Sequence, residues 1–260
     1  MTYSPGGRVA RANSAPSERR ITSVCGPCLR DHWQKGRSGD KHAARLTGAA
    51  RHPKHAVLMI RAFLFDIGNV LLKFDFSVAM KKTLALSEVH DAIEATTQID
   101  RIKLGYEDGQ IDRAAFLRGV FDVLRYRGTE ADFIDAWEDI FTPNEPMIAL
   151  LDRLHGRFPL YLLSNTSDIH RDYIFRRYEF FGRFTAGTYS YEAKASKPGR
   201  EIYEIAQRQL GIEPATTFFI DDLLPNIETA RSLGFNAHHY HHDDHAALLA
   251  AVKAAGVELE

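Results

Sequence analysis

Residues 61–70 read RAFLFDIGNV, a short apolar run that ends in Asp66 and is followed by a glycine and an asparagine. A continuous apolar run of this length is typical of a strand buried on both faces, as in a parallel sheet. Two further runs have the same form, PLYLLSN at 159–165 and TTFFIDD at 216–222, and residues 236–241 predict a fourth strand. We therefore predict a sheet whose strands each end in polar side chains.

Helical patterns lie between these strands. Apolar residues recur at helical spacing over 146–155, 201–210 and 227–233. Gly211 and Gly234 follow the last two patterns, at the position where glycine commonly ends a helix. Strands that alternate with helices predict an α/β fold with a doubly wound, Rossmann-like parallel sheet.

One segment interrupts this alternation directly after the first strand. From residue 78 to residue 141 the pattern is helical throughout, most clearly over 113–126 and 131–141. An insertion at this point stands over the carboxyl ends of the strands, where open α/β sheets bind ligands. We interpret it as a small helical cap, with an independent interaction module as the alternative. The predicted division is an extension at 1–58, a core at 59–77 and 142–260, and a cap at 78–141.

The first 58 residues differ in composition from the remainder. They hold 11 basic and three acidic residues, whereas 59–260 hold 22 basic and 31 acidic ones. The extension lacks any apolar period, so we expect a disordered basic segment. Cys25 and Cys28 form a Cys-Gly-Pro-Cys pair outside any strand–helix context, which leaves redox chemistry, zinc binding and chance all open.

The chain of 260 residues has 45% hydrophobic and 26% charged residues, ordinary values for a globular protein. It contains no run of 18 apolar residues, so a cytoplasmic protein without a membrane segment is expected. Nucleic acid is not an expected partner, because aromatic residues do not interleave with the basic ones. The sequence does not indicate an oligomeric state.

Side chains able to perform chemistry collect at the predicted strand ends and in one loop. They are Asp66, Ser164, Asn165, Lys197, Asp221 and Asp222. The carboxyl ends of parallel strands meet at one edge of a sheet, so these groups are expected to converge. Adjacent acids such as Asp221 and Asp222 repel each other unless a cation or a proton lies between them. Two carboxylates can hold Mg²⁺, while a lysine and a hydroxyl stabilise a transferring phosphoryl group.

The ordered set of motifs resembles the haloacid dehalogenase-like hydrolase superfamily. The motifs are Asp66-x-Gly-Asn-Val, Leu-Ser164-Asn-Thr, Lys197-Pro and Phe-x-Asp221-Asp, with Asn226 four residues later. The resemblance covers about residues 60–245, and the first two motifs look most like the α-glucose-1-phosphatase type of sugar-phosphate phosphatase. It implies a Mg²⁺-dependent phosphoric monoester hydrolase that acts on small phosphorylated metabolites, with sugar phosphates favoured. A 2-haloacid dehalogenase and a catalytically weak binding or regulatory protein are the alternatives.

The resemblance also implies roles for individual residues. Asp66 corresponds to the nucleophile that forms an aspartyl-phosphate. The metal ligands would be Asp66, the Gly68 carbonyl and Asp222; the phosphate-binding residues would be Ser164, Asn165 and Lys197; Asp221 and Asn226 would support them. Lys197 also has a catalytic role, and the proline that follows it favours it over Lys194.

Two features depart from the usual pattern. Most phosphatases of this superfamily carry a second aspartate two residues after the nucleophile, as the acid that protonates the leaving oxygen, and here that position is Gly68. The second is the histidine-rich stretch at 238–245, which is expected to lie away from the edge of the sheet that carries the nucleophile.

Tyr106 and Glu107, in the insertion, are candidate substrate contacts.

Overall fold

A five-stranded parallel sheet forms the centre of the computed structural model, which describes residues 59–89 and 91–259. Its strand order is β5-β4-β1-β6-β7, so β1 lies between β4 and β6. The strands are β1 (Ala62–Phe65), β4 (Leu160–Ser164), β5 (Ala186–Tyr189), β6 (Thr217–Asp221) and β7 (Asn236–His239). The predicted parallel sheet is confirmed, and β5, which has only one large apolar residue, was not predicted.

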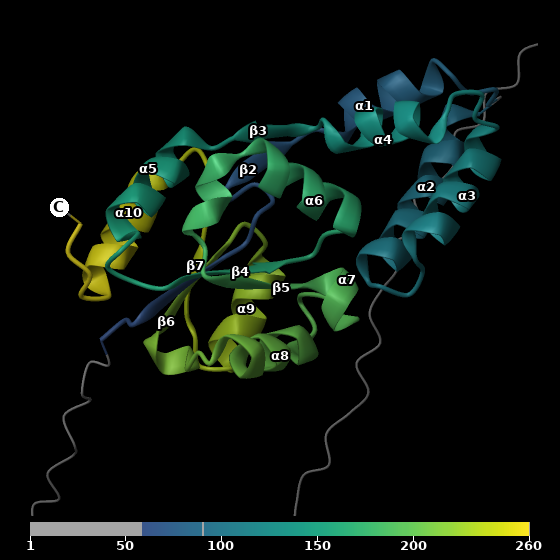
Figure 1. Ribbon diagram of the computed structural model, residues 1–260. Helices are drawn as coiled ribbons and strands as arrows, with labels where there is room; N and C mark the ends of the chain where they lie inside the picture. Colours follow the sequence, from purple (N-terminus) through teal and green to yellow (C-terminus); the bar gives the residue numbers. More distant parts are fainter. Residues whose placement is uncertain (1–58, 90, 260) are drawn as a thin grey trace, which may run out of the picture. The chain divides into compact units, whose positions relative to one another are not determined.

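Helices cover both faces of the sheet (Figure 1). Phe63 and Phe65 of β1 pack with α5 and α10 on one face, whereas Ala62 and Leu64 pack with α8 and α9 on the other. This alternation follows from the two-residue period of a strand. The helices are α5 (Glu145–Leu154), α6 (Asp168–Arg177), α7 (Ser190–Ala193), α8 (Arg200–Leu210), α9 (Leu224–Ser232) and α10 (His245–Ala254), with 3-10 turns at Glu179–Arg183 and Pro214–Thr216.

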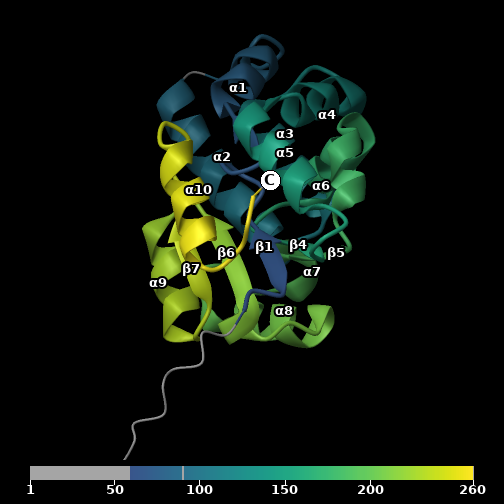
Figure 2. The same cartoon turned by 90° about the vertical axis from the view of Figure 1, so that its left-hand side faces the viewer.

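The described residues of the insertion after β1 form four helices, which gather at one end of the strands (Figure 2). They are α1 (Phe76–Leu84), α2 (Ala92–Glu107), α3 (Arg113–Leu124) and α4 (Glu130–Glu138). Asp91, Asp112 and Thr129 each accept a hydrogen bond at the start of the next helix. Side-chain caps of this kind satisfy backbone N–H groups that lack a helical partner. Phe116 and Trp137 belong to a separate buried cluster that holds these helices together.

A short antiparallel ribbon connects the insertion to the core. Strand β2 (Leu72–Phe74) pairs with β3 (Phe141–Pro143), with Phe74 opposite Phe141. The prediction of helix as far as residue 141 was therefore wrong, because α4 ends at Glu138. Strands of three residues are too short to produce a readable alternation.

Part of the sequence-based prediction lies outside the described residues. The basic segment 1–58 and the Cys25–Cys28 pair belong to that part. Among the residues that are described, the helices are all too short or too polar to cross a bilayer.

Candidate active site

A buried lysine links the ends of three strands. The Lys197 ammonium lies 2.9 Å from Asp66 Oδ1 and 2.7 Å from Asp221 Oδ2, and it donates a hydrogen bond of 2.8 Å to the carbonyl of Leu163. Its side chain is 1% exposed. A lysine is almost never buried to this degree unless its charge is paired, and here two carboxylates supply the pairing.

The strands fix both carboxylates. Asp66 follows β1, and its backbone N–H donates to the carbonyl of Ile220 on the neighbouring strand, at 2.9 Å. Asp221 ends β6, and its Oδ1 accepts hydrogen bonds of 2.9 Å from the Leu223 backbone and from Asn226 Nδ2. The sequence-based role of Asn226 as a supporting residue therefore has a definite contact, which is with Asp221.

Asn165 positions the loop that carries the lysine. Its Oδ1 accepts from the backbone N–H of Lys197 and its Nδ2 donates to the Lys197 carbonyl, both at 2.9 Å. Both ends of the amide are thus engaged with one peptide segment. The side chain holds the loop of Lys197 against β4 and also lines the cavity described below, and its expected part in phosphate binding stays a prediction.

Three carboxylates meet at this point. Oxygen atoms of Asp66, Asp221 and Asp222 all lie within 4.8 Å of one another. Asn69, in the left-handed conformation with φ 53°, donates from Nδ2 to Asp222 at 3.0 Å. With one ammonium among them, three ionised carboxylates leave two negative charges uncompensated. An all-oxygen set with this charge fits a divalent cation such as Mg²⁺.

The crowding changes the acidity of the carboxylates. Burial raises the pKa of Asp66 to about 7, and Lys197 opposes that rise while Asp221 adds to it. Burial also raises the pKa of Asp222. For Lys197, burial alone would lower the pKa, yet the charges of Asp221 and Asp66 outweigh it and the pKa is raised. The ammonium is therefore the permanent cation of the site.

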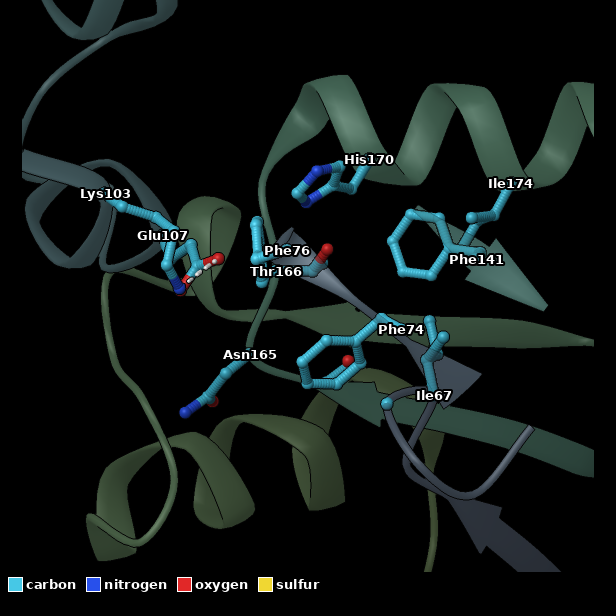
Figure 3. Close-up of a pocket in the computed structure, with 12 residues that line it drawn as sticks. Ile67, Phe74, Phe76, Lys103, Glu107, Phe141, Asn165, Thr166, His170 and Ile174 are labelled. Atoms are coloured by element: carbon cyan, nitrogen blue, oxygen red, sulfur yellow. Dashed lines mark hydrogen bonds and ion pairs between the residues drawn. The ribbon is translucent and has the colours of Figure 1, made fainter. Parts of the chain in front are cut away.

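A cavity of about 140 Å³ opens beside these groups (Figure 3). Gly68 and Ser164 line it close to the strand ends. A Cβ atom on Gly68 would lie 2.9 Å from Cε1 of Phe74, which is closer than side chains approach. The Phe74 ring thus occupies the space that a side chain at position 68 would enter.

The remaining predicted residues divide between this cavity and other places. Glu107 lines the cavity, whereas Tyr106 bonds to Asp168 and lines a different one together with Lys194. Of the two candidate lysines, Lys197 lies between Asp66 and Asp221 and Lys194 lines the other cavity. The expectation that the histidine-rich stretch lies away from the nucleophile edge was wrong. His239 pairs with Asp221 across β6 and β7, and its Nε2 contacts the Asp222 carbonyl at 2.8 Å.

Several residues of the cavity were not predicted from the sequence. They are Ile67, Phe74, Phe76, Lys103, Phe141, Thr166, His170 and Ile174. His170 bonds through Nε2 to the carbonyl of Trp137 at 3.0 Å, and burial lowers its pKa to about 4. The imidazole is thus neutral near pH 7. Phe76, His170 and Ile174 lie on helices, where their spacing is that of core residues, and Phe74 and Phe141 lie on strands of only three residues, so the local pattern did not single them out.

The fold places a cluster of acids at the carboxyl edge of a parallel α/β sheet, which is where proteins of this architecture bind ligands. The sequence model of the haloacid dehalogenase-like hydrolase family matches residues 60–234. This protein therefore belongs to the haloacid dehalogenase-like hydrolases. The prediction of a hydrolase of this superfamily is confirmed, and the structure brings together three acids that could hold a cation.

Similar proteins include a D-ribitol-5-phosphate phosphatase of Bacteroides thetaiotaomicron. It is 26% identical over 191 residues, which are 68% of this chain and 90% of the relative. A crystal structure of a haloacid dehalogenase family enzyme from the same organism has a TM-score of 0.67 at 28% identity, over 74% of this chain and 98% of that one. Another structure, a complex with magnesium and inorganic phosphate, has a TM-score of 0.64 at 29% identity, over 70% and 95%.

The L-2-haloacid dehalogenase of Xanthobacter autotrophicus shares the fold at a lower level. Its TM-score is 0.51 at 19% identity, over 69% of this chain and 76% of that one. At this identity the likeness concerns the fold.

Proposed function

We propose that this protein is a Mg²⁺-dependent phosphatase of small phosphorylated metabolites, with sugar phosphates as the favoured class. The observation that carries the proposal is the buried Lys197 between Asp66 and Asp221, beside a third carboxylate on Asp222. A cation site next to a fixed carboxylate and an ammonium suits the transfer of a dianionic phosphoryl group. The magnesium and phosphate complex of the Bacteroides enzyme supports the same assignment.

Asp66 acts as the nucleophile in this proposal. Its Oδ1 accepts from Lys197 Nζ at 2.9 Å and from the backbone N–H of Ile67 at 2.7 Å. Since both bonds use Oδ1, we assign the attack on phosphorus to Oδ2. A bond forms between Oδ2 and phosphorus while the ester oxygen leaves with its electron pair. Water then releases phosphate from the aspartyl-phosphate and restores the carboxylate.

The phosphoryl group is held by Ser164 and Lys197, and Asn165 keeps Lys197 in place. Asp66, the Gly68 carbonyl and Asp222 would hold Mg²⁺, which neutralises charge on the phosphoryl oxygens when bound. Asp221, fixed by Asn226, pairs with the ammonium and so orients it toward Asp66.

The ester oxygen leaves without a proton from position 68, because Gly68 has no acidic side chain. Phosphoryl transfer has a loose transition state in which charge builds on the leaving oxygen. Sugar 1-phosphates, acyl phosphates and aryl phosphates tolerate this charge better than sugar 6-phosphates, and we propose them as preferred substrates. The Bacteroides relative is named for a 5-phosphate, so primary-alcohol esters are the competing class.

Hydrolysis of 4-nitrophenyl phosphate with Mg²⁺ and with a chelator tests the proposal. Mg²⁺-dependent release of phosphate is the expected result. Turnover of 2-chloropropionate without Mg²⁺, and no turnover of the ester, would instead identify a dehalogenase. Binding of phosphate esters with no turnover in either assay would identify a catalytically weak binding or regulatory protein.

A further inference from the structure

The cavity beside the strand ends has an apolar wall and a charged wall. Phe74, Phe76, Phe141 and Ile174 supply the apolar wall, while Lys103 and Glu107 face it from α2 (Figure 3). A cavity of about 140 Å³ has room for a group the size of one ring, since an apolar cavity of roughly 150 Å³ can hold benzene. A leaving group of five or six carbons matches this size.

The charged wall consists of one ion pair, between two residues that lie one helical turn apart on α2. Lys103 Nζ lies 3.1 and 3.2 Å from the two carboxylate oxygens of Glu107. The two side chains are only 19% and 15% exposed. Helix stabilisation does not require such burial, since Glu94 and Gln98 form a bond of the same spacing on the exposed surface of α2. Burying a charged pair costs desolvation, so its place in the cavity needs another reason.

Contacts to the core fix the position of Glu107. Its backbone carbonyl accepts a hydrogen bond of 2.5 Å from Ser190 Oγ, and the same Oγ accepts from the backbone N–H of Thr166 at 3.0 Å. The next residue, Asp108, bonds to Ser196 in the loop that leads to Lys197. The backbone of Glu107 is thereby held at a defined place relative to the strand end that carries Ser164, and Lys103 holds its carboxylate.

We propose that Lys103 and Glu107 bind hydroxyl groups of the leaving group, an inference that rests on the proposed phosphatase function. The carboxylate accepts from hydroxyls, the ammonium donates to them, and the carbon face of the substrate packs on Phe74. The Phe76 ring supports Lys103, whose ammonium lies 4.9 Å from the ring centroid. Because Lys103 and Glu107 neutralise each other, the charged wall carries no net charge and offers no free cation to a leaving group with its own carboxylate. The pair thus selects neutral polyhydroxylated phosphates, that is, sugar or polyol phosphates, against phosphorylated carboxylic acids.

The test compares three substrates with Mg²⁺ present: a five-carbon polyol phosphate, 3-phosphoglycerate and phenyl phosphate. The wild-type protein should have a kcat/KM for the polyol phosphate at least tenfold above that for 3-phosphoglycerate. Glu107→Gln should reduce this ratio at least tenfold, mainly through KM, because the neutral amide leaves Lys103 without its counter-charge and free to bind the carboxylate. Glu94→Gln, on the same helix, is the matched control and should leave the ratio unchanged.

The possible results distinguish a failure of the inference about Lys103 and Glu107 from a failure of the proposed phosphatase function. A wild-type preference for 3-phosphoglycerate overturns the inference even if the variant fails to fold. A ratio that changes less than twofold in a folded Glu107→Gln protein, or an equal fall of kcat for all three substrates, also overturns it. If the wild-type protein hydrolyses none of the three esters, the proposed phosphatase function itself has failed.

Discussion

The two ends of the cavity are built differently. Beside its strand end, Asp66 follows β1, Asp221 ends the neighbouring strand β6, and the two share Lys197 between them. At the other end, Lys103 and Glu107 belong to a helix of the insertion. In our proposals the first end performs the chemistry and the second selects the leaving group. The difference implies that reaction rate and substrate preference can be changed separately, and each prediction below tests that separation.

The largest effect is expected at the nucleophile. Asp66→Asn keeps the shape and the hydrogen-bonding oxygen beside Lys197 but removes the nucleophilic charge. We expect kcat to fall about 10³-fold or more for every substrate, with the melting temperature preserved. Turnover above about a tenth of the wild-type value would remove Asp66 from this role. An equal loss of kcat for all substrates would indicate that Asp66 takes part in the reaction and does not select the substrate.

The second prediction concerns the buried cation. Lys197→Met leaves Asp66 and Asp221 without their counter-charge, so kcat should fall about 10²-fold. Breaking a buried pair in this way typically costs about 3–5 kcal/mol, and urea unfolding of the Mg²⁺-free protein should show a loss of this order. Lys194→Met is the matched control, since Lys194 lines a different cavity. An equal effect of both substitutions would contradict the assignment.

The third prediction concerns how the stability of the protein depends on pH and on Mg²⁺. Burial raises the folded-state pKa of Asp66 from 3.8 to about 7. Between these values the unfolded chain loses its proton while the folded chain retains it, so the Mg²⁺-free protein should lose stability as the pH rises from about 4 to 7. Mg²⁺ binds the ionised carboxylates, and it should therefore raise the melting temperature more at pH 8 than at pH 5.

Two variants locate the origin of that thermal shift. Asp222→Ala should remove most of the Mg²⁺-induced rise together with Mg²⁺-stimulated activity. A double substitution of His241 and His242 by alanine should leave both intact. If the histidine variant loses the shift and the Asp222 variant keeps it, the cation site has been placed wrongly.

The sequence was sufficient to predict the acids at the strand ends, but it was insufficient to predict most of the residues that line the cavity. Parallel strands bring their carboxyl ends together whatever the loops do, so the convergence of Asp66 and Asp221 could be predicted from the strands that carry them. The role of Asn165 toward Lys197 depends on how one loop folds back on β4. Phe74 belongs to a three-residue strand whose partner lies 67 residues further along the chain, and local periodicity contains no information about such a pairing.

The smallest effect is expected where the two ends meet, at Gly68 and Phe74. The backbone of Gly68 lies outside the left-handed region, so contact with Phe74 at 2.9 Å decides whether an aspartate fits. Gly68→Asp alone should lose stability and gain little activity. In Gly68→Asp with Phe74→Ala the carboxyl group has room beside the leaving oxygen, and general acid catalysis contributes about 10²-fold or more where it is well placed. For primary-alcohol esters we expect kcat/KM to rise about tenfold relative to Phe74→Ala alone, and for phenyl esters we expect almost no rise.

Measuring kcat/KM over esters of graded leaving-group pKa shows whether the residue at position 68 supplies the proton to the leaving oxygen. If the wild-type protein shows no dependence on leaving-group pKa, a residue other than the one at position 68 already supplies the proton, and the two ends of the cavity are not separate.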